Sequence, residues 1–117
     1  MNLSEQEIQI LGSCESGTFR IWIGGPLAEV ERACAEFCTE CGFCVAIEPV
    51  RYVYTGARED GVVVTVLNYP RFPKSLGELR SVSNELAQFL IERGYQRSAT
   101  VEGPDQSSYF SRMESST

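Results

Sequence analysis

Cysteines are the residues of this sequence whose type and spacing most suggest chemistry. Four of the five lie in the stretch ACAEFCTECGFC, residues 33–44. Thiolates bind zinc and iron–sulfur clusters, and they attack substrates when a basic neighbour lowers their pKa. The first question is therefore whether these thiols hold a metal, act as nucleophiles or fill a hydrophobic core.

Metal binding by the cysteines is disfavoured by geometry. The spacing Cys34-x3-Cys38-x2-Cys41 matches the cluster triad of radical-SAM enzymes, but the barrel of those enzymes is far longer than this chain of 117 residues. On one helix the three sulfurs would spread over about 10 Å, whereas zinc needs sulfurs at ~2.3 Å from a common centre. A zinc knuckle at Cys41 and Cys44 would need Cys14 and Cys38 as well, because the chain has no histidine. We expect no metal and no cofactor.

Catalysis is disfavoured by the same lack of histidine. Cys14 lies in the loop GSCESG, where a neighbouring carboxylate would raise a thiol pKa. General acid–base work would need Glu48, Tyr52 or Tyr54 in a cleft. We therefore interpret Cys34, Cys38 and Cys41 as small apolar residues on the buried face of the first helix, and we expect no catalytic residue and no enzyme activity.

Composition and charge exclude several classes of protein. A chain of this length fits one domain, and its net charge of −6 opposes attraction to nucleic-acid backbones. The longest apolar run, 62–67, is too short to cross a membrane, and the N-terminus lacks the basic and apolar segments of a secretory signal. An odd number of clustered cysteines favours reduced thiols, so we expect a cytoplasmic protein.

The elements that must position these residues alternate in type along the chain. Hydrophobic periodicity predicts strands over residues 19–23, 43–54, 62–67 and 95–102, and helices over 26–41 and 76–93. This order predicts an α+β fold of the ferredoxin-like βαββαβ type, with two helices packed on one face of a four-stranded antiparallel sheet.

Local signals support these boundaries. Ser75 and Glu78 have the spacing of a capping box, and Gly42 ends the first helix. Pro49 cannot donate a ladder hydrogen bond, so its strand should lie at a sheet edge or carry a bulge. Residues 55–61, TGAREDG, are predicted to form a turn in which Glu59 is solvated.

The chain divides into three parts. Residues 1–18 form an N-terminal segment, in which a capping-box spacing predicts a short helix over residues 5–11. Residues 19–102 form the single α+β domain. Residues 103–117 are polar and rich in serine, and we expect a loose tail or one that orders on a partner.

The sheet face opposite the helices is the main functional lead. Phe19, Ile21 and Ile23 alternate with Arg20 and Trp22, so that Trp22 should point to the open face beside an arginine. Trp, Tyr and Arg are enriched at binding hot spots, and the first helix adds an acidic surface. The predicted partner-binding residues are Arg20, Trp22, Glu29, Glu31, Glu36, Tyr52 and Tyr54. A homodimer that covers this face is the main alternative.

Several blocks of the sequence resemble a group of small phage and prophage proteins without an assigned reaction. The blocks lie within residues 19–102 and are Ile21-Trp22-Ile23, Glu36-Phe37-Cys38, Cys44-Val45, Tyr54-Thr55-Gly56, Gly61-Val62 and, most specifically, Asn68-Tyr69-Pro70-Arg71-Phe72-Pro73. The resemblance implies a small protein that works inside a bacterial host, where such proteins often inhibit host machinery, including CRISPR complexes.

Our first hypothesis is therefore a non-enzymatic, acidic binding module that occludes a basic surface of a host defence or nucleic-acid-handling protein, in the manner of an anti-CRISPR inhibitor. The second is a small-molecule or nucleotide site, or a minor enzyme, at the Gly24–Gly25 turn or a cleft beside Tyr52 and Tyr54. The third is a structural homo-oligomer.

Overall fold

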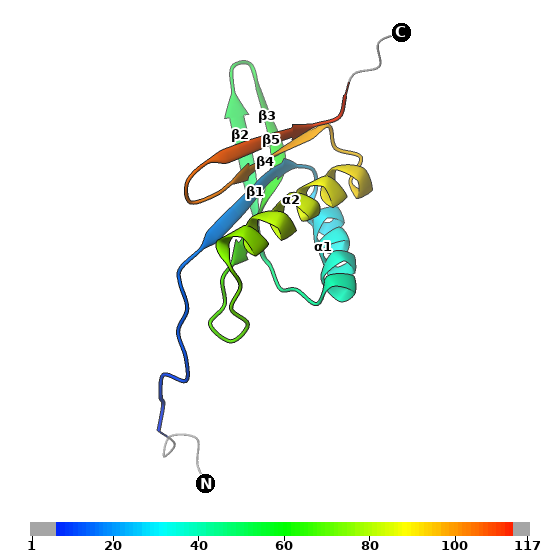
Figure 1. The fold of residues 1–117 in the computed structure, drawn as a ribbon. Coiled ribbons are helices and arrows are strands. Elements are labelled where there is room, and N and C mark those ends of the chain that lie inside the picture. Colours follow the sequence, from blue (N-terminus) through cyan, green and yellow to red (C-terminus); the bar gives the residue numbers. More distant parts are fainter. Residues whose placement is uncertain (1–6, 114–117) are drawn as a thin grey trace.

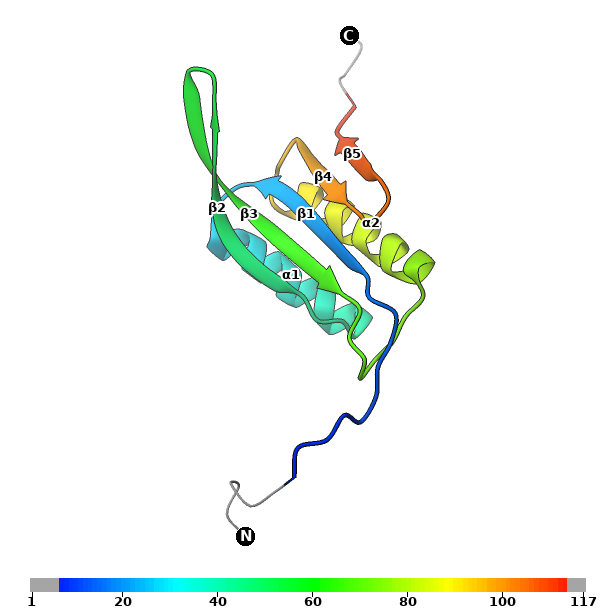
Figure 2. The same ribbon diagram turned by 90° about the vertical axis from the view of Figure 1, so that its left-hand side faces the viewer.

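A computed structural model of the protein describes residues 7–113 as two helices packed on one face of a five-stranded antiparallel sheet (Figures 1 and 2). The sheet order is β2-β3-β1-β4-β5. In chain order the elements are β1 (Thr18–Gly24), α1 (Leu27–Cys41), β2 (Ala46–Tyr54), β3 (Ala57–Leu67), α2 (Leu76–Arg93), β4 (Ser98–Glu102) and β5 (Ser107–Ser111). In this part of the chain, neither helix combines the length and apolar character that crossing a bilayer requires.

The core lies between the sheet and the two helices. Phe19, Ile21 and Ile23 of β1 are buried there, as their alternation with polar residues predicts. The other buried apolar side chains come from both helices and the flanking strands; they are Val30, Ala33, Cys34, Phe37, Val62, Val64, Val66, Leu79, Leu86, Ala87, Leu90, Ile91, Ala99 and Val101. Neither helix covers the opposite face of the sheet, where Val63 beside Trp22 is nevertheless buried.

Several predictions from the sequence are confirmed. The order of the first six elements is strand, helix, strand, strand, helix, strand, and both helices lie on the same face. The Pro49 strand lies at a sheet edge. Ser75 forms the capping box with Glu78 at the start of α2, and Gly42 follows the last residue of α1.

The prediction of four strands is wrong, because part of the expected tail forms β5. Residues Ser107–Ser111 pair with β4 along its whole length. Phe110 lies opposite Ala99 and packs against the core, whereas the side chain of Tyr109 is exposed. The alternation of these aromatics with serines is strand-like, but the polar composition of the segment concealed it.

The predicted turn over residues 55–61 is also wrong. The turn between β2 and β3 is confined to Thr55 and Gly56, and Gly56 has a φ of 78°, which glycine adopts without a steric penalty. Both strands therefore extend as a long hairpin, whose tip projects beyond the rest of the sheet (Figure 2). The extension places Glu59 on β3, directly opposite Tyr52.

The N-terminal segment is extended where a helix was predicted. Residues 7–11 have no helical structure, and residues 5 and 6 lie outside the described residues. The buried side chain of Asn68 anchors the segment: its Nδ2 donates to the Glu15 carbonyl (2.8 Å) and the Lys74 carbonyl (3.0 Å), and its Oδ1 accepts from the Lys74 N–H (2.9 Å). Its backbone N–H donates to the Gly17 carbonyl.

Replacement of Asn68 should destabilise the fold. Asn68→Ala removes three hydrogen bonds of a buried side chain to the Glu15 and Lys74 backbone, so we expect the free energy of unfolding to fall by about 2–3 kcal/mol in chemical denaturation. Asn84→Ala on α2 is the matched control and should change stability by less than about 0.5 kcal/mol. Equal midpoints for the two variants would contradict the anchoring role of Asn68.

Candidate functional site

The register of β1 determines which side chains meet on the open face. Trp22 lies between Val63 of β3 and Thr100 of β4, and Arg20 lies between Thr65 and Glu102. Directly paired residues in antiparallel strands point to the same face of the sheet. The open face therefore carries aromatic, hydroxyl and charged groups in adjacent rows.

Trp22 is held by a charged partner. Its Nε1 donates to the Glu102 carboxylate at 3.0 Å, and the Arg20 guanidinium lies 3.8 Å from the same oxygen. Because the indole N–H is satisfied in this way, the orientation of the half-buried ring is fixed. The sequence predicted that Arg20 and Trp22 would share this face, but it gave no indication of Glu102.

Tyr52 comes from β2 and forms a second aromatic wall. Its hydroxyl donates to the Ile23 carbonyl at 3.3 Å. Burial and then the nearby Glu59 carboxylate raise the pKa of the Tyr52 phenol, so it stays protonated at neutral pH. Gly61 permits this placement, because a Cβ there would lie 2.8 Å from the Ile23 carbonyl oxygen and would collide with the tyrosine ring.

A hollow of about 200 Å³ lies between these aromatic residues. Its lining comes from four strands, β1 to β4, and its polar members include Glu59 of β3 and Ser98 and Thr100 of β4. Glu48 adds a further carboxylate to this face, because it pairs with Val63, which in turn pairs with Trp22. We call Trp22, Tyr52, Glu59, Ser98 and Thr100 the open-face site. Its aromatic faces and carboxylates suit a cationic ligand.

The predicted partner-binding residues do not all come together. Arg20, Trp22 and Tyr52 share the open face, whereas Tyr54 is more than half exposed near the hairpin tip. The three glutamates lie on α1, on the other side of the sheet: Glu29, Glu31 and Glu36. Glu36 forms an ion pair with Arg93 at 3.0 Å.

Glu59 was not among the predicted site residues, because the sequence pattern predicts a solvated turn at this position. The signal that could have placed it is Thr55-Gly56, a two-residue hairpin connection after which the pairing of β2 and β3 continues to Glu59.

The cysteines differ from one another in environment. Cys34 is buried in the core, and burial raises the pKa of its thiol to about 12. Burial also raises the pKa of Cys38, with smaller effects from Cys44 and Cys41. Cys41 and Cys44 are exposed, so the prediction that Cys41 lies on the buried face of the first helix is wrong. Within residues 7–113, no three cysteine or carboxylate side chains converge as metal ligands do.

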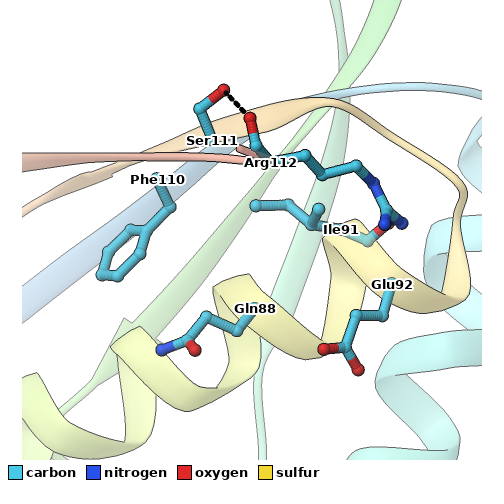
Figure 3. Close-up of a pocket in the computed structure, with 6 residues that line it drawn as sticks. All are labelled: Gln88, Ile91, Glu92, Phe110, Ser111 and Arg112. Carbon is cyan, nitrogen blue, oxygen red and sulfur yellow. Dashed lines mark hydrogen bonds between the residues drawn. The ribbon is translucent and has the colours of Figure 1, made fainter. Parts of the chain in front are cut away.

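A hollow of about 330 Å³ that includes Glu31, Cys38 and Phe43 also lacks a basic side chain, whereas three other hollows contain one. One lies between α2 and the end of β5 (Figure 3) and carries Arg112, whose guanidinium donates to the backbone carbonyls of Ile91 (2.9 Å) and Gln96 (2.8 Å). Another, of about 270 Å³, has aromatic walls but includes the cation Lys74. A third contains Arg32 and Arg93. In each of these a basic side chain would repel a positive charge.

Two solved structures share the fold of this chain. The first is a phage SAM lyase in its apo state, with a TM-score of 0.78, 18% sequence identity and coverage of 94% of this chain and 99% of that chain. The second is a phage SAM lyase in complex with S-methyl-5'-thioadenosine, with a TM-score of 0.71, 16% identity and coverage of 91% and 97%. No protein-family model and no curated protein sequence matches the chain.

These similarities overturn the first hypothesis from the sequence. The structures that share the fold over nearly the whole chain are of an enzyme, and neither is of an inhibitor or an anti-CRISPR protein. The expectations of a non-enzymatic binding module and of no enzyme activity are therefore wrong. The alternative of a small-molecule site or a minor enzyme fits the comparison better.

The environments of the cysteines predict different thiol reactivities. At pH 8 an alkylating reagent should modify Cys41 and Cys44 in the native protein, and it should modify Cys34 only after denaturation, because the buried thiol stays protonated. Peptide mass spectrometry of native and denatured samples measures each site. Labelling of native Cys34 as fast as Cys44 would contradict its burial.

Proposed function

We propose that this chain is a lyase that cleaves S-adenosylmethionine (SAM) and releases S-methyl-5'-thioadenosine. The fold similarity supports the reaction, and the open-face site supports the place where it occurs. The observation that carries the proposal is a hollow walled by Trp22 and Tyr52 with the Glu59 carboxylate at its edge. This hollow also includes Gly24 and the cleft beside Tyr52, which the second hypothesis from the sequence named.

The substrate's sulfonium explains why this chemistry suits the open face. A sulfonium cation is attracted to aromatic faces, most strongly to tryptophan, and the Trp22 ring is already oriented by Glu102. Glu59 and Glu48 add negative potential on the same face. The hollow is too small for all of SAM, so we assign the sulfonium end to it and expect the adenosine part to lie across the exposed sheet.

The product defines the bond that breaks. S-methyl-5'-thioadenosine keeps the methyl and adenosyl groups on sulfur, so cleavage occurs between sulfur and Cγ of the methionine-derived chain. In an internal displacement, a carboxylate oxygen of the substrate attacks its own Cγ, a C–O bond forms, and the electron pair of the C–S bond passes to sulfur. The products are a neutral thioether and a lactone, and neither water nor a protein proton is consumed.

The residues of the open-face site match this route. The phenol of Tyr52 stays protonated at neutral pH and is engaged with the Ile23 carbonyl, so it is not a base. The chain can nevertheless hold the substrate in a folded conformation, which brings nucleophile and Cγ together. Because the sulfonium and carboxylate charges cancel in the transition state, the apolar surfaces of Trp22 and Tyr52 favour the reaction more than water does.

Such a lyase would act where SAM is made, and we place it in the cytoplasm of a bacterial host. All five cysteines are unpaired, which agrees with a reducing compartment. The resemblance of the sequence to phage and prophage proteins points to the same setting.

The proposal predicts cleavage of SAM by the purified protein. Liquid chromatography should show S-methyl-5'-thioadenosine formed in equal amount to the SAM consumed. In H₂¹⁸O the first four-carbon product should be a lactone without ¹⁸O. A rate no higher than the uncatalysed rate would refute the proposal. Detection of vinylglycine as the co-product would show that the reaction is an elimination and not an internal displacement.

Substitutions on the open face test whether the reaction occurs there. Trp22→Ala should lower the affinity for SAM by about 30-fold, equivalent to a desolvated cation–π contact of about 2 kcal/mol. Glu59→Gln should lower it by about tenfold through the lost charge. Tyr54→Phe near the hairpin tip is the control and should keep normal affinity. Unchanged affinity in Trp22→Ala would move the site elsewhere.

A further inference from the structure

The loop between β3 and α2 carries aromatic side chains that the core does not use. Tyr69 and Phe72 belong to the block NYPRFP, and neither is part of the buried cluster between the sheet and the helices. Phe72 is 64% exposed despite its size, and Leu67 at the start of the loop is 38% exposed. Neighbouring large apolar side chains at the surface of a folded domain mark a place for recognition.

These side chains form one wall of an aromatic groove of about 270 Å³. The opposite wall comes from the segment between α1 and β2, where Phe43 lies. The volume is below the ~300 Å³ at which pockets for small organic ligands begin. The groove therefore suits one or two side chains of a protein segment better than a whole small molecule.

Two cations lie beside the aromatic walls. The Arg71 guanidinium is 5.4 Å from the centroid of the Phe72 ring, and the Lys74 ammonium is 5.7 Å from the centroid of the Phe43 ring. None of the ion pairs within residues 7–113 uses Arg71 or Lys74. In a chain of net charge −6, these two groups remain able to pair with carboxylates of a partner.

The groove is fixed before any partner binds. The Asn68 side chain donates to the Lys74 carbonyl and accepts from the Lys74 N–H at 3.0 and 2.9 Å. The Phe72 N–H donates to the Tyr69 carbonyl at 2.9 Å, and the Cys44 thiol donates to the Tyr69 hydroxyl at 4.0 Å. A wall held in this way loses little conformational entropy on binding, which favours affinity.

We propose that the aromatic groove binds an acidic segment of another protein. A large apolar side chain of that segment fills the space between the rings, and its carboxylates pair with Arg71 and Lys74. A nucleic acid fits less well, because its dense negative charge is opposed by the net charge of −6. The inference is independent of SAM cleavage, since it uses none of the open-face residues.

Selection from a display library of random peptides tests the chemistry of the partner. The full-length protein should enrich peptides in which a leucine or an aromatic residue lies within a few positions of aspartate or glutamate. The variant Arg71→Glu/Lys74→Glu should not enrich these peptides, because its groove would repel their carboxylates. Enrichment of no peptide, or of peptides without acidic residues, would overturn the proposal.

Single substitutions then test the place of binding, with a fluorescein-labelled peptide from the selection and fluorescence anisotropy. Phe72→Ser should raise the dissociation constant by about 30-fold, as loss of an aromatic anchor does. Lys74→Glu should raise it by about tenfold or more. Both variants should keep the wild-type unfolding midpoint, because Phe72 is mostly exposed and Asn68 binds only the backbone of Lys74.

Matched controls come from the hairpin. Val53→Ser removes a side chain that is 75% exposed, and Arg58→Glu reverses a charge on the residue paired with Val53; both should leave the dissociation constant unchanged. Binding to Phe72→Ser as tight as to wild type would overturn the groove assignment. So would displacement of the labelled peptide by ATP or a short oligothymidylate as effectively as by unlabelled peptide. SAM cleavage, measured on the same variants, reports only on the open face.

Discussion

One-sided burial of the sheet is the constraint on which the rest of the structure depends. Both helices cover the same face, so alternate residues of β1 are committed to the core and the others to the open face. Phe19, Ile21 and Ile23 fix that register, because a shift by one residue would expose all three. The same register sets Trp22 between Val63 and Thr100, and Arg20 between Thr65 and Glu102. The geometry of the candidate site is thus a consequence of how the core packs.

Much of this arrangement can be predicted from the sequence, but only where the pattern is local. The alternation of FRIWI places Trp22 on the open face, the capping box begins α2, and Pro49 marks an edge strand. The start of β3 and the whole of β5 were not predicted, and the physical reason is the same for both. Glu59 and the serines around Tyr109 are polar on an exposed part of the sheet, and exposed strand residues give little hydrophobic signal.

The activity was harder to predict than the fold, and the proposed reaction explains why. Sequence reasoning searches for nucleophiles and bases, and this chain has no histidine and no catalytic motif. A substrate that carries both its own nucleophile and its own leaving group needs neither. The enzyme only has to provide a surface that holds the substrate in a folded conformation and favours the loss of charge. Aromatic residues such as Trp22 and Tyr52 can provide such a surface, but they are equally typical of protein-recognition sites. The cysteines that first drew attention lie on or near α1, on the other side of the sheet.

The most direct test of a ligand site on the open face is a titration of the ¹⁵N-labelled protein with S-methyl-5'-thioadenosine, followed by NMR. The chain has one tryptophan, so a single indole N–H signal reports on Trp22. We predict that this signal and the amides of Tyr52 and Thr100 shift in a saturable manner, because the ligand lies beside the Glu102–Trp22 hydrogen bond. Shifts confined to Phe43, Tyr69 and Phe72, or no saturable shift, would contradict a binding site on the open face.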